Sequence, residues 1–313
     1  MAGRRPPDRS SPDLPPRSPA RRLLGLGLSL IAAAALLLLG EALLQQVRSG
    51  GSPSLFRSSE VPGLIYDAVP GLRAEQGQDS RLPPWIVEID EDGARRTPPG
   101  DPGCPSIWVF GDSYAHGWGV ANDQSWPAQL QVTLSGSLGC LPAVRNWALP
   151  GYNLSQMQVR LQHLLTASTA DTPPDLVLIH FEEFDGFPDF DFSNPLGLPR
   201  FLRQSAFLRP LQVLRVLQFD RSITEDPAAS AAQALRLKTG LEQLGEWAKS
   251  QKLSVIPIAE PEVSEQLRQV AREQFGVFVP LDSCEAFRFE VDPHTMEAPR
   301  FMGGGGAPEA AAA

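Results

Sequence analysis

The sequence predicts an α/β protein: a three-layer α/β/α domain with a mainly parallel five-stranded sheet, preceded by one N-terminal transmembrane helix. From residue 105 onward, short apolar segments alternate with longer segments of helical periodicity, which is the pattern of βαβ units. Upstream of them, residues 23–40 carry no charge at all. The chain has 313 residues, enough for one domain with a large core or for two small domains.

The uncharged segment 23–40, LLGLGLSLIAAAALLLLG, is close to the roughly 20 apolar residues that a membrane span needs. Arg21 and Arg22 precede it, and the next basic residue is Arg48, so the positive-inside rule leaves the N-terminus in the cytoplasm. A cleaved signal peptide, the alternative, would have a shorter apolar region and a small-residue cleavage site. We therefore predict an uncleaved anchor over residues 23–46.

The regions around this anchor differ in composition. Residues 1–22 are rich in proline, arginine and serine and are predicted to form a disordered cytoplasmic tail. Residues 47–103 are predicted to form a linker and an irregular extension with one strand or hairpin. The main domain is expected over residues 104–302, followed by a low-complexity, disordered tail over residues 303–313.

The main domain supplies five predicted strands and their helices. Apolar runs predict strands at 106–110, 143–149, 175–181, 253–260 and 277–281, and helical spacing predicts helices at 125–134, 154–165, 207–219, 231–251 and 261–276. Met157, Leu161 and Leu164 share one face of their helix. Residues 182–226 are an insertion rich in aromatic residues and proline, with one helix of its own.

Charge and cysteine content narrow the possible partners. The net charge is −9, and residues 1–22 carry six arginines and two aspartates, so the rest of the chain carries −13 and does not suit nucleic acid. The cysteines Cys104, Cys140 and Cys284 include no CxxC pair for a zinc cluster. Cys104 and Cys140 each come shortly before a predicted strand, and parallel neighbouring strands would bring them together. A Cys104–Cys140 disulfide is predicted, with three free thiols as the alternative.

Three groups with catalytic potential follow predicted strands. Ser113 follows the first strand, Gly151 the second, and Asp292 and His294 the fifth. In a parallel sheet, ligands bind at the carboxyl ends of the strands. A serine nucleophile needs a base, and a histidine base needs an acid to fix its tautomer. Ser113, His294 and Asp292 therefore form a candidate triad, with the backbone N–H groups of Ser113 and Gly151 as oxyanion donors.

The other histidines have weaker functional signals. His116 lies in a loop and His163 on a helix, and both are interpreted as structural. His180 ends a buried strand, where it either faces the site or is a hydrogen-bonded core residue, and we favour the core interpretation. The acidic stretch 182–191 lacks the regular ligand spacing of a calcium loop. We predict neither a metal nor a cofactor.

Several motifs together resemble the SGNH/GDSL hydrolase superfamily, in its membrane-anchored bacterial form with a flavodoxin-like sheet. They are FGDSYAHGWGV, SWPAQL, NWALPGYNLSQ, PDLVLIHF and a late DPH, preceded by GLIYDAVPGLR and VEIDEDGARR. The resemblance spans roughly residues 105–294 and is densest before residue 180. It implies Ser113 as nucleophile and oxyanion donor, Gly151 as a second donor, and Asp292 and His294 as acid and base.

Two features depart from that family. Phe184 stands where the family has an oxyanion asparagine, and losing one such donor costs about 2.7–4 kcal/mol of transition-state stabilisation. Asn153 and His180 are possible accessory residues in its place. After His294, the segment TMEAPRFMGGGG lacks the family's terminal helix pattern.

The resemblance implies an extracytoplasmic serine esterase or acyl-transfer enzyme, anchored in a bacterial inner membrane by a single span. Its expected substrate is an ester-linked acyl group such as acetyl, carried by a carbohydrate among other acceptors. One alternative is an inactive module on the same fold that binds a glycan or an assembly partner, which Phe184 favours. Another is a tethered scaffold whose function lies in residues 182–226, where rings and carboxylates either bind sugars or form a solvated loop.

Overall fold

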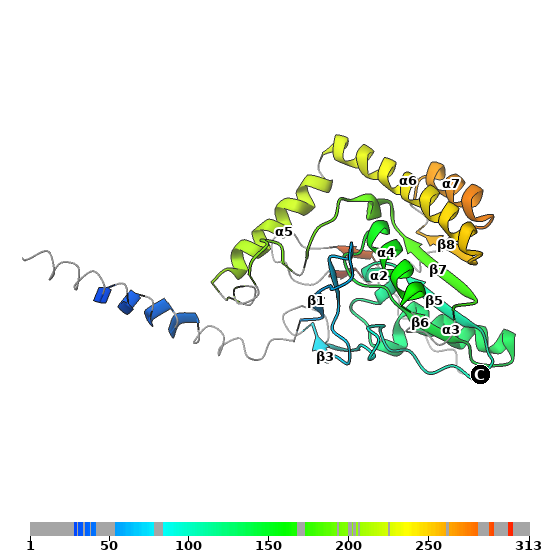
Figure 1. Cartoon of the computed structure of the whole chain (residues 1–313), viewed down its shortest axis with the longest axis horizontal. Helices are drawn as coiled ribbons and strands as arrows, with labels where there is room; N and C mark the ends of the chain where they lie inside the picture. Colours follow the sequence, from blue (N-terminus) through cyan, green and yellow to red (C-terminus); the bar gives the residue numbers. More distant parts are fainter. Residues whose placement is uncertain are drawn as a thin grey trace, which may run out of the picture. The chain divides into compact units, whose positions relative to one another are not determined.

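A parallel five-stranded sheet organises the main body of the chain (Figure 1). Its strands are β5 (Ser106–Phe110), β6 (Ala143–Asn146), β7 (Leu176–Phe181), β8 (Val255–Ala259) and β9 (Val279–Pro280), in the spatial order β6-β5-β7-β8-β9. All four neighbouring pairs are parallel. The five predicted strands and their parallel arrangement are thus confirmed.

The computed structural model describes only part of the chain. The described residues are 28–41 except 30, 34 and 38, together with 54–77, 84–167, 173–192, 194–199, 202, 205, 207–224, 226–260, 263–280, 288–290 and 300–302. They fall into two units, residues 1–50 and residues 51–313.

Helices cover both faces of the sheet, because the side chains of each strand alternate between them. Ile107 and Val109 of β5 face a core completed by α3 (Trp126–Leu138). Trp108 and Phe110 face a larger core. That core is covered by α4 (Leu154–Thr166), α6 (Pro227–Gln251) and α7 (Glu265–Phe275). Met157, Leu161 and Leu164 are buried there, as their spacing predicts. The α/β/α prediction is confirmed.

The segment before the sheet is more regular than predicted. It forms two two-stranded antiparallel sheets, β1 (Phe56–Ser58) with β2 (Tyr66–Ala68), and β3 (Arg73–Gln76) with β4 (Trp85–Glu88). These strands are only three or four residues long, so their apolar pattern is too short to be recognised in the sequence.

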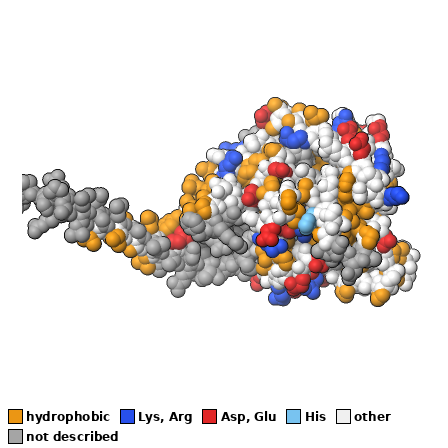
Figure 2. All heavy atoms as spheres, in the orientation of Figure 1, with side chains coloured by type: hydrophobic (Ala, Val, Ile, Leu, Met, Phe, Trp, Pro, Cys, Tyr) orange, Lys and Arg blue, Asp and Glu red, His pale blue; other side chains and the backbone are white. Residues whose placement is uncertain are grey.

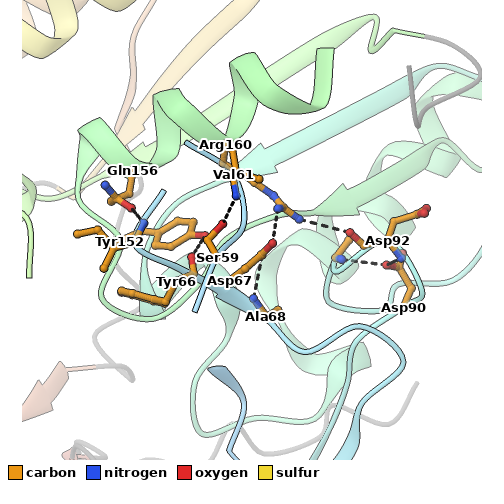
Figure 3. Close-up of polar contacts among 12 residues, drawn as sticks. Ser59, Val61, Tyr66, Asp67, Ala68, Asp90, Asp92, Tyr152, Gln156 and Arg160 are labelled. Carbon is orange, nitrogen blue, oxygen red and sulfur yellow. Dashed lines mark hydrogen bonds and ion pairs between the residues drawn. The ribbon is translucent and has the colours of Figure 1, made fainter. Parts of the chain in front are cut away.

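Buried polar contacts hold this segment against α4 (Figure 3). The guanidinium of Arg160 donates to the carboxylate of Asp67 at 2.6 Å, and both side chains are buried. The hydroxyl of Tyr152 donates to the carbonyl oxygen of Tyr66 at 3.0 Å. The backbone N–H of Ile65 donates to Gln156 at 2.8 Å. The described residues of the extension are therefore packed against the main body through buried polar contacts.

The disulfide between Cys104 and Cys140 is present, with a Cα–Cα distance of 6.0 Å. It joins the residues just before β5 and β6, as the parallel pairing predicts. Cys284 lies outside the described residues. The disulfide therefore lies at the amino ends of β5 and β6, opposite the carboxyl ends where Ser113 is found.

In the unit that comprises residues 1–50, the described residues between 28 and 41 are helical. Leu28, Ile31, Leu36, Leu37 and Leu39 are between 57% and 69% exposed. No helix within the described part of the chain is long and apolar enough to cross a membrane. Because the anchor predicted over residues 23–46 lies partly outside those residues, it stays a prediction.

One face of the second unit has a mixed surface. On the face shown in Figure 2, basic and acidic side chains are interspersed among uncharged groups. Two short backbone segments, β10 (Arg288–Glu290) and β11 (Arg300–Met302), pair antiparallel near the end of the chain. Asp292 and His294 fall between them in sequence and lie outside the described residues.

Candidate active site

The strand order creates a topological switch point at the carboxyl ends of β5 and β7. The chain passes from β5 to β6 on one side, and then to β7 on the other side of β5. The connections on either side therefore diverge, and ligands of open α/β sheets bind in the crevice that this leaves. Ser113 lies three residues after the last residue of β5, and His180 is the penultimate residue of β7. Both sequence-predicted residues thus lie at the expected edge.

A tight strand-to-helix turn places Ser113. Gly111 has no side chain, and a Cβ at this position would lie 2.5 Å from the Cβ of Ala115 and 3.1 Å from the Cβ of His180. The short helix α2 (Ser113–His116) follows, and the Asp112 carboxylate caps it by accepting from the N–H of Tyr114 at 2.9 Å. Glycine at position 111 therefore lets the serine turn pack directly against β7.

The hydroxyl of Ser113 donates to the Asp112 carboxylate at 3.3 Å. The Ser113 side chain is half-buried, so it is neither sealed in the core nor fully solvated. As the first residue of α2, it also lies where helical N–H groups have no partner within the helix. A negative charge that develops beside this hydroxyl would be stabilised by such donors.

Arg95 binds the C-terminal end of α2 and the loop that follows it. Its guanidinium is buried and donates to the carbonyl oxygens of His116, Gly117 and Val120. It also donates to the side chain of Asn122 at 3.0 Å. Burial lowers the pKa of Arg95 to about 10, so the group remains a cation at neutral pH. A residue of the N-terminal extension thus fixes the loop that follows the nucleophile candidate.

His116 was predicted to lie in a loop with a structural role, but it is the last residue of α2. Its ring is fully buried, and Nδ1 lies 2.9 Å from the carbonyl oxygen of Ala148. Burial lowers its pKa to about 3, and the nearby Arg95 cation acts in the same direction. His116 is therefore neutral at any pH at which the protein would operate.

His180 is buried as predicted, but the prediction that it is a hydrogen-bonded core residue is wrong within the described residues. Nδ1 lies 3.7 Å from Oδ1 of Asp112, and Nε2 lies 3.5 Å from Oε1 of Glu260. Neither ring nitrogen has a hydrogen-bonding partner in the described chain. Burial lowers the pKa of His180, but the two carboxylates more than offset this effect and raise it to about 10.

Gly151 follows β6 with a φ of +80°, a conformation that favours glycine. A Cβ there would lie 2.7 Å from both the Phe192 ring and the Tyr66 hydroxyl. Two residues later, Asn153 caps α4 by accepting from the N–H of Gln156 at 2.9 Å. Its amide donates to the carbonyl of Phe187 and to Asp189. In this structure the Asn153 amide binds the insertion.

The insertion after β7 places an exposed ring beside a buried acid. Phe184 in the short helix η2 (Glu183–Gly186) is 55% exposed. Asp185 is buried and accepts from the N–H of Glu182 at 2.9 Å. Burial raises the pKa of Asp185, and the negative charges of Asp112 and Glu182 raise it further. The Phe184 side chain has no polar group, so it cannot donate a hydrogen bond to a ligand at this edge.

Aromatic rings anchor the rest of the insertion. Phe190 stacks on Phe219 of α5 (Arg209–Thr224), with ring centroids 4.0 Å apart. Phe187 and Phe192 contact Phe219 edge-on. This cluster continues to Tyr66 of the extension through Phe192. Phe187, Phe190 and Phe192 of the insertion thus pack against other rings.

The structure brings together Ser113, Asp112 and His180, whereas Asp292 and His294 lie outside the described residues. The sequence analysis missed Glu260 and Arg95. Glu260 directly follows β8, so its place at the carboxyl edge was readable once that strand was predicted. Arg95 had no comparable signal, because its partners are backbone carbonyls. Among the described residues, no group of histidine, cysteine and acidic side chains could hold a metal ion.

Comparisons with known proteins yield weak likenesses. No protein family matches the chain, and no curated protein matches it. One similar solved structure is "Crystal structure of AlinE4, a SGNH-hydrolase family esterase", with 16% identity, a TM-score of 0.34, and coverage of 57% of this chain and 76% of that chain. "Crystal Structure of TesA" has 20% identity and a TM-score of 0.31, and covers 55% and 71%. The psychrotrophic esterase EstA from Pseudoalteromonas sp. has 14% identity and a TM-score of 0.33, and covers 58% and 80%. These values establish neither a family nor an activity for this chain.

Proposed function

We propose that this chain is a serine esterase or acyl-transfer enzyme in which Ser113 is the nucleophile. One observation carries the proposal: Ser113 lies at the N-terminus of a helix at the switch point of a parallel sheet, half-buried, with its hydroxyl on a carboxylate. A surface serine in an ordinary turn would not need the buried Arg95 and the glycine contact that fix this turn.

In the proposed reaction, Ser113 attacks the carbonyl carbon of an ester. His294, oriented by Asp292, takes the serine proton and then delivers it to the leaving alcohol. Backbone N–H groups of Ser113 and Gly151 stabilise the oxyanion. Water or a sugar hydroxyl then removes the acyl group from Ser113, which completes hydrolysis or transfer respectively.

We further propose that the enzyme is anchored by residues 23–46 with its main body outside the cytoplasm, at a bacterial inner membrane. The uncharged segment 23–40 supports the anchor, as do the exposed leucines of the described helical residues. A Cys104–Cys140 disulfide suits an oxidising compartment. The substrate would be an acyl ester, with O-acetylated carbohydrate as the expected class.

Hydrolysis of p-nitrophenyl acetate by the purified full-length chain tests the reaction. We expect Ser113→Ala and His294→Ala each to lower kcat by on the order of 10⁴-fold or more. The matched control Ser137→Ala changes an exposed serine of α3 and should leave the rate unaltered. Equal rates for the wild type and Ser113→Ala would contradict the proposal.

A second candidate function is binding without catalysis. The exposed Phe184 favours it, and so does the Asn153 amide, which is bonded to the insertion instead of facing a substrate. A folded wild type without esterase activity that binds O-acetylated oligosaccharide, and loses that binding in Phe184→Ala, would support this candidate over the enzyme.

A further inference from the structure

The His180 ring lies between two carboxylates that come from the strands on either side of β7. Asp112 follows β5, and Glu260 follows β8. The distances from the two ring nitrogens to the nearest carboxylate oxygens are 3.7 and 3.5 Å. The His180 side chain is 0% exposed, so both contacts are shielded from bulk solvent. Three adjacent strands thus place one cationic and two anionic side chains at the same edge.

This geometry selects the protonation state of His180. A neutral imidazole has one nitrogen without a hydrogen, and here that nitrogen would face a carboxylate oxygen. Only the imidazolium presents an N–H to each carboxylate. Glu182 adds negative charge on the insertion side, whereas the buried Asp185 has a raised pKa that favours its neutral form. The rings of Tyr114 and Trp126 lie against the imidazole. The raised pKa of His180 agrees with this assignment.

His180 contacts the residues on both sides of the nucleophile candidate. Asp112 precedes Ser113, and its second oxygen accepts from the Ser113 hydroxyl at 3.3 Å. Tyr114 follows Ser113, and its ring stacks on His180 with centroids 5.1 Å apart and planes 18° apart. A change in the charge or shape of His180 would therefore reach Ser113 from two directions.

We propose that His180 is a positioning residue for Ser113: a buried imidazolium that holds Asp112 and Tyr114 and thereby fixes the orientation of the serine side chain. This role rests on the proposed function. It differs from that of an oxyanion donor, because the carboxylates of Asp112 and Glu260 lie 3.7 and 3.5 Å from the two ring nitrogens. The proton on His180 is not transferred in the reaction, and its charge holds the acceptor of the Ser113 hydroxyl in place.

The first test measures the charge of His180 directly. The full-length chain with ¹⁵N-labelled histidine has four histidines, and His180→Phe identifies the resonances of the missing one. We expect both ring nitrogens of His180 to stay protonated from pH 6 to pH 9. Loss of one proton near pH 6.5 would overturn the proposal, whether or not any variant is active.

The second test follows the rate at which a fluorophosphonate labels Ser113. Loss of positioning in His180→Phe or Asp112→Asn should slow labelling roughly 10–100-fold, and the double variant should be no slower than the slower single one. His163→Phe, on α4, is the matched control and should label at the wild-type rate. Labelling of folded His180→Phe at the wild-type rate would overturn the proposal.

Glu260→Gln provides a variant that leaves the serine turn and the His180 ring in place. In the wild type, the labelling rate should fall at alkaline pH, where His180 loses its proton. Glu260→Gln removes one of the two carboxylates that stabilise this proton, so the fall in rate should occur at lower pH. A purely structural role for His180 predicts no such shift, and an unchanged profile would contradict our proposal.

If the wild type does not label at all, the proposed function fails and this role fails with it. If the wild type labels but His180→Phe labels equally fast, only the role of His180 fails.

Discussion

His116 and His180 are both fully buried near Ser113, but His116 is neutral and His180 is cationic at neutral pH. The ring of His116 bonds to a backbone carbonyl and lies close to the Arg95 cation. The ring of His180 lies between the carboxylates of Asp112 and Glu260. Burial disfavours the charged form of both rings, so neighbouring charges decide the outcome. Two equally buried histidines therefore differ in charge: His116 is a neutral, packed side chain, and His180 is a buried cation.

Arg95 holds the loop that follows His116, so replacing Arg95 should have the largest effect on the free energy of unfolding. Arg95→Met would leave three backbone carbonyls without their buried donor, at about 1–3 kcal/mol each before relaxation. We expect a loss of about 3–5 kcal/mol in the free energy of unfolding, measured with urea. The control Arg73→Met removes only an exposed ion pair with Glu88 and should cost about 1 kcal/mol or less. Equal losses in the two variants would contradict the support that we assign to Arg95.

Gly111 lies where the turn before Ser113 packs against His180 of β7. Gly111→Ala would place a Cβ within 2.5 Å of Ala115 and 3.1 Å of His180, so the turn and β7 must separate. We expect a cost of about 1–3 kcal/mol in unfolding free energy and slower labelling of Ser113. Gly136→Ala is a suitable control, because Gly136 lies within α3 with open space around its Cβ position, and it should not destabilise the protein. A stable Gly111→Ala protein that labels normally would mean that close packing on His180 is unnecessary.

The pH dependence of stability should have opposite signs at the two histidines. The pKa of His180 rises on folding from 6.5 to about 10, so its contribution is complete below pH 6.5 and is lost as the pH rises toward 10. The pKa of His116 falls on folding to about 3, so its contribution is complete above pH 6.5 and is lost as the pH falls toward 3. Each slope should approach about 1.4 kcal/mol per pH unit.

Urea unfolding of the wild type, His180→Phe and His116→Phe across pH 4–9.5 measures these slopes. The difference between the wild type and His180→Phe should shrink on the alkaline side, and the difference between the wild type and His116→Phe should shrink on the acidic side. Slopes of the same sign for both histidines would refute the contrast between them.

The smallest effect is expected from the ring that covers His180. Tyr114→Leu removes the stacked partner of the imidazolium, and an aromatic face beside a cation contributes about 0.5–2 kcal/mol. Tyr114→Phe keeps the ring and should preserve that stability. The unfolding free energies of the two variants at pH 7 give the comparison, and a Leu variant as stable as the Phe variant would mean that the stacking contributes nothing.

Sequence patterns were sufficient to predict the strands and helices of the parallel sheet. Apolar runs and helical spacing predicted β5 to β9 and their helices, since periodicity reports directly on buried faces. The parallel arrangement then led to the Cys104–Cys140 disulfide and to the location of Ser113 at the carboxyl edge.

What the sequence did not reveal depends on distant partners. Arg95 looks like a surface arginine until its backbone acceptors are known, and Glu260 gains significance only because β8 lies beside β7. The charge of His180 follows from two carboxylates that are 68 and 80 residues away in sequence, which no local pattern reports. Asp292 and His294 stay predictions from the sequence.

The central claim is that Ser113 is an activated nucleophile, and peptide mass spectrometry after fluorophosphonate treatment tests it most directly. We expect one phosphonyl group on the peptide that contains Ser113, none in Ser113→Ala, and an undiminished label in the control Ser137→Ala. A folded wild type without that adduct, or with the adduct on another serine, would contradict it.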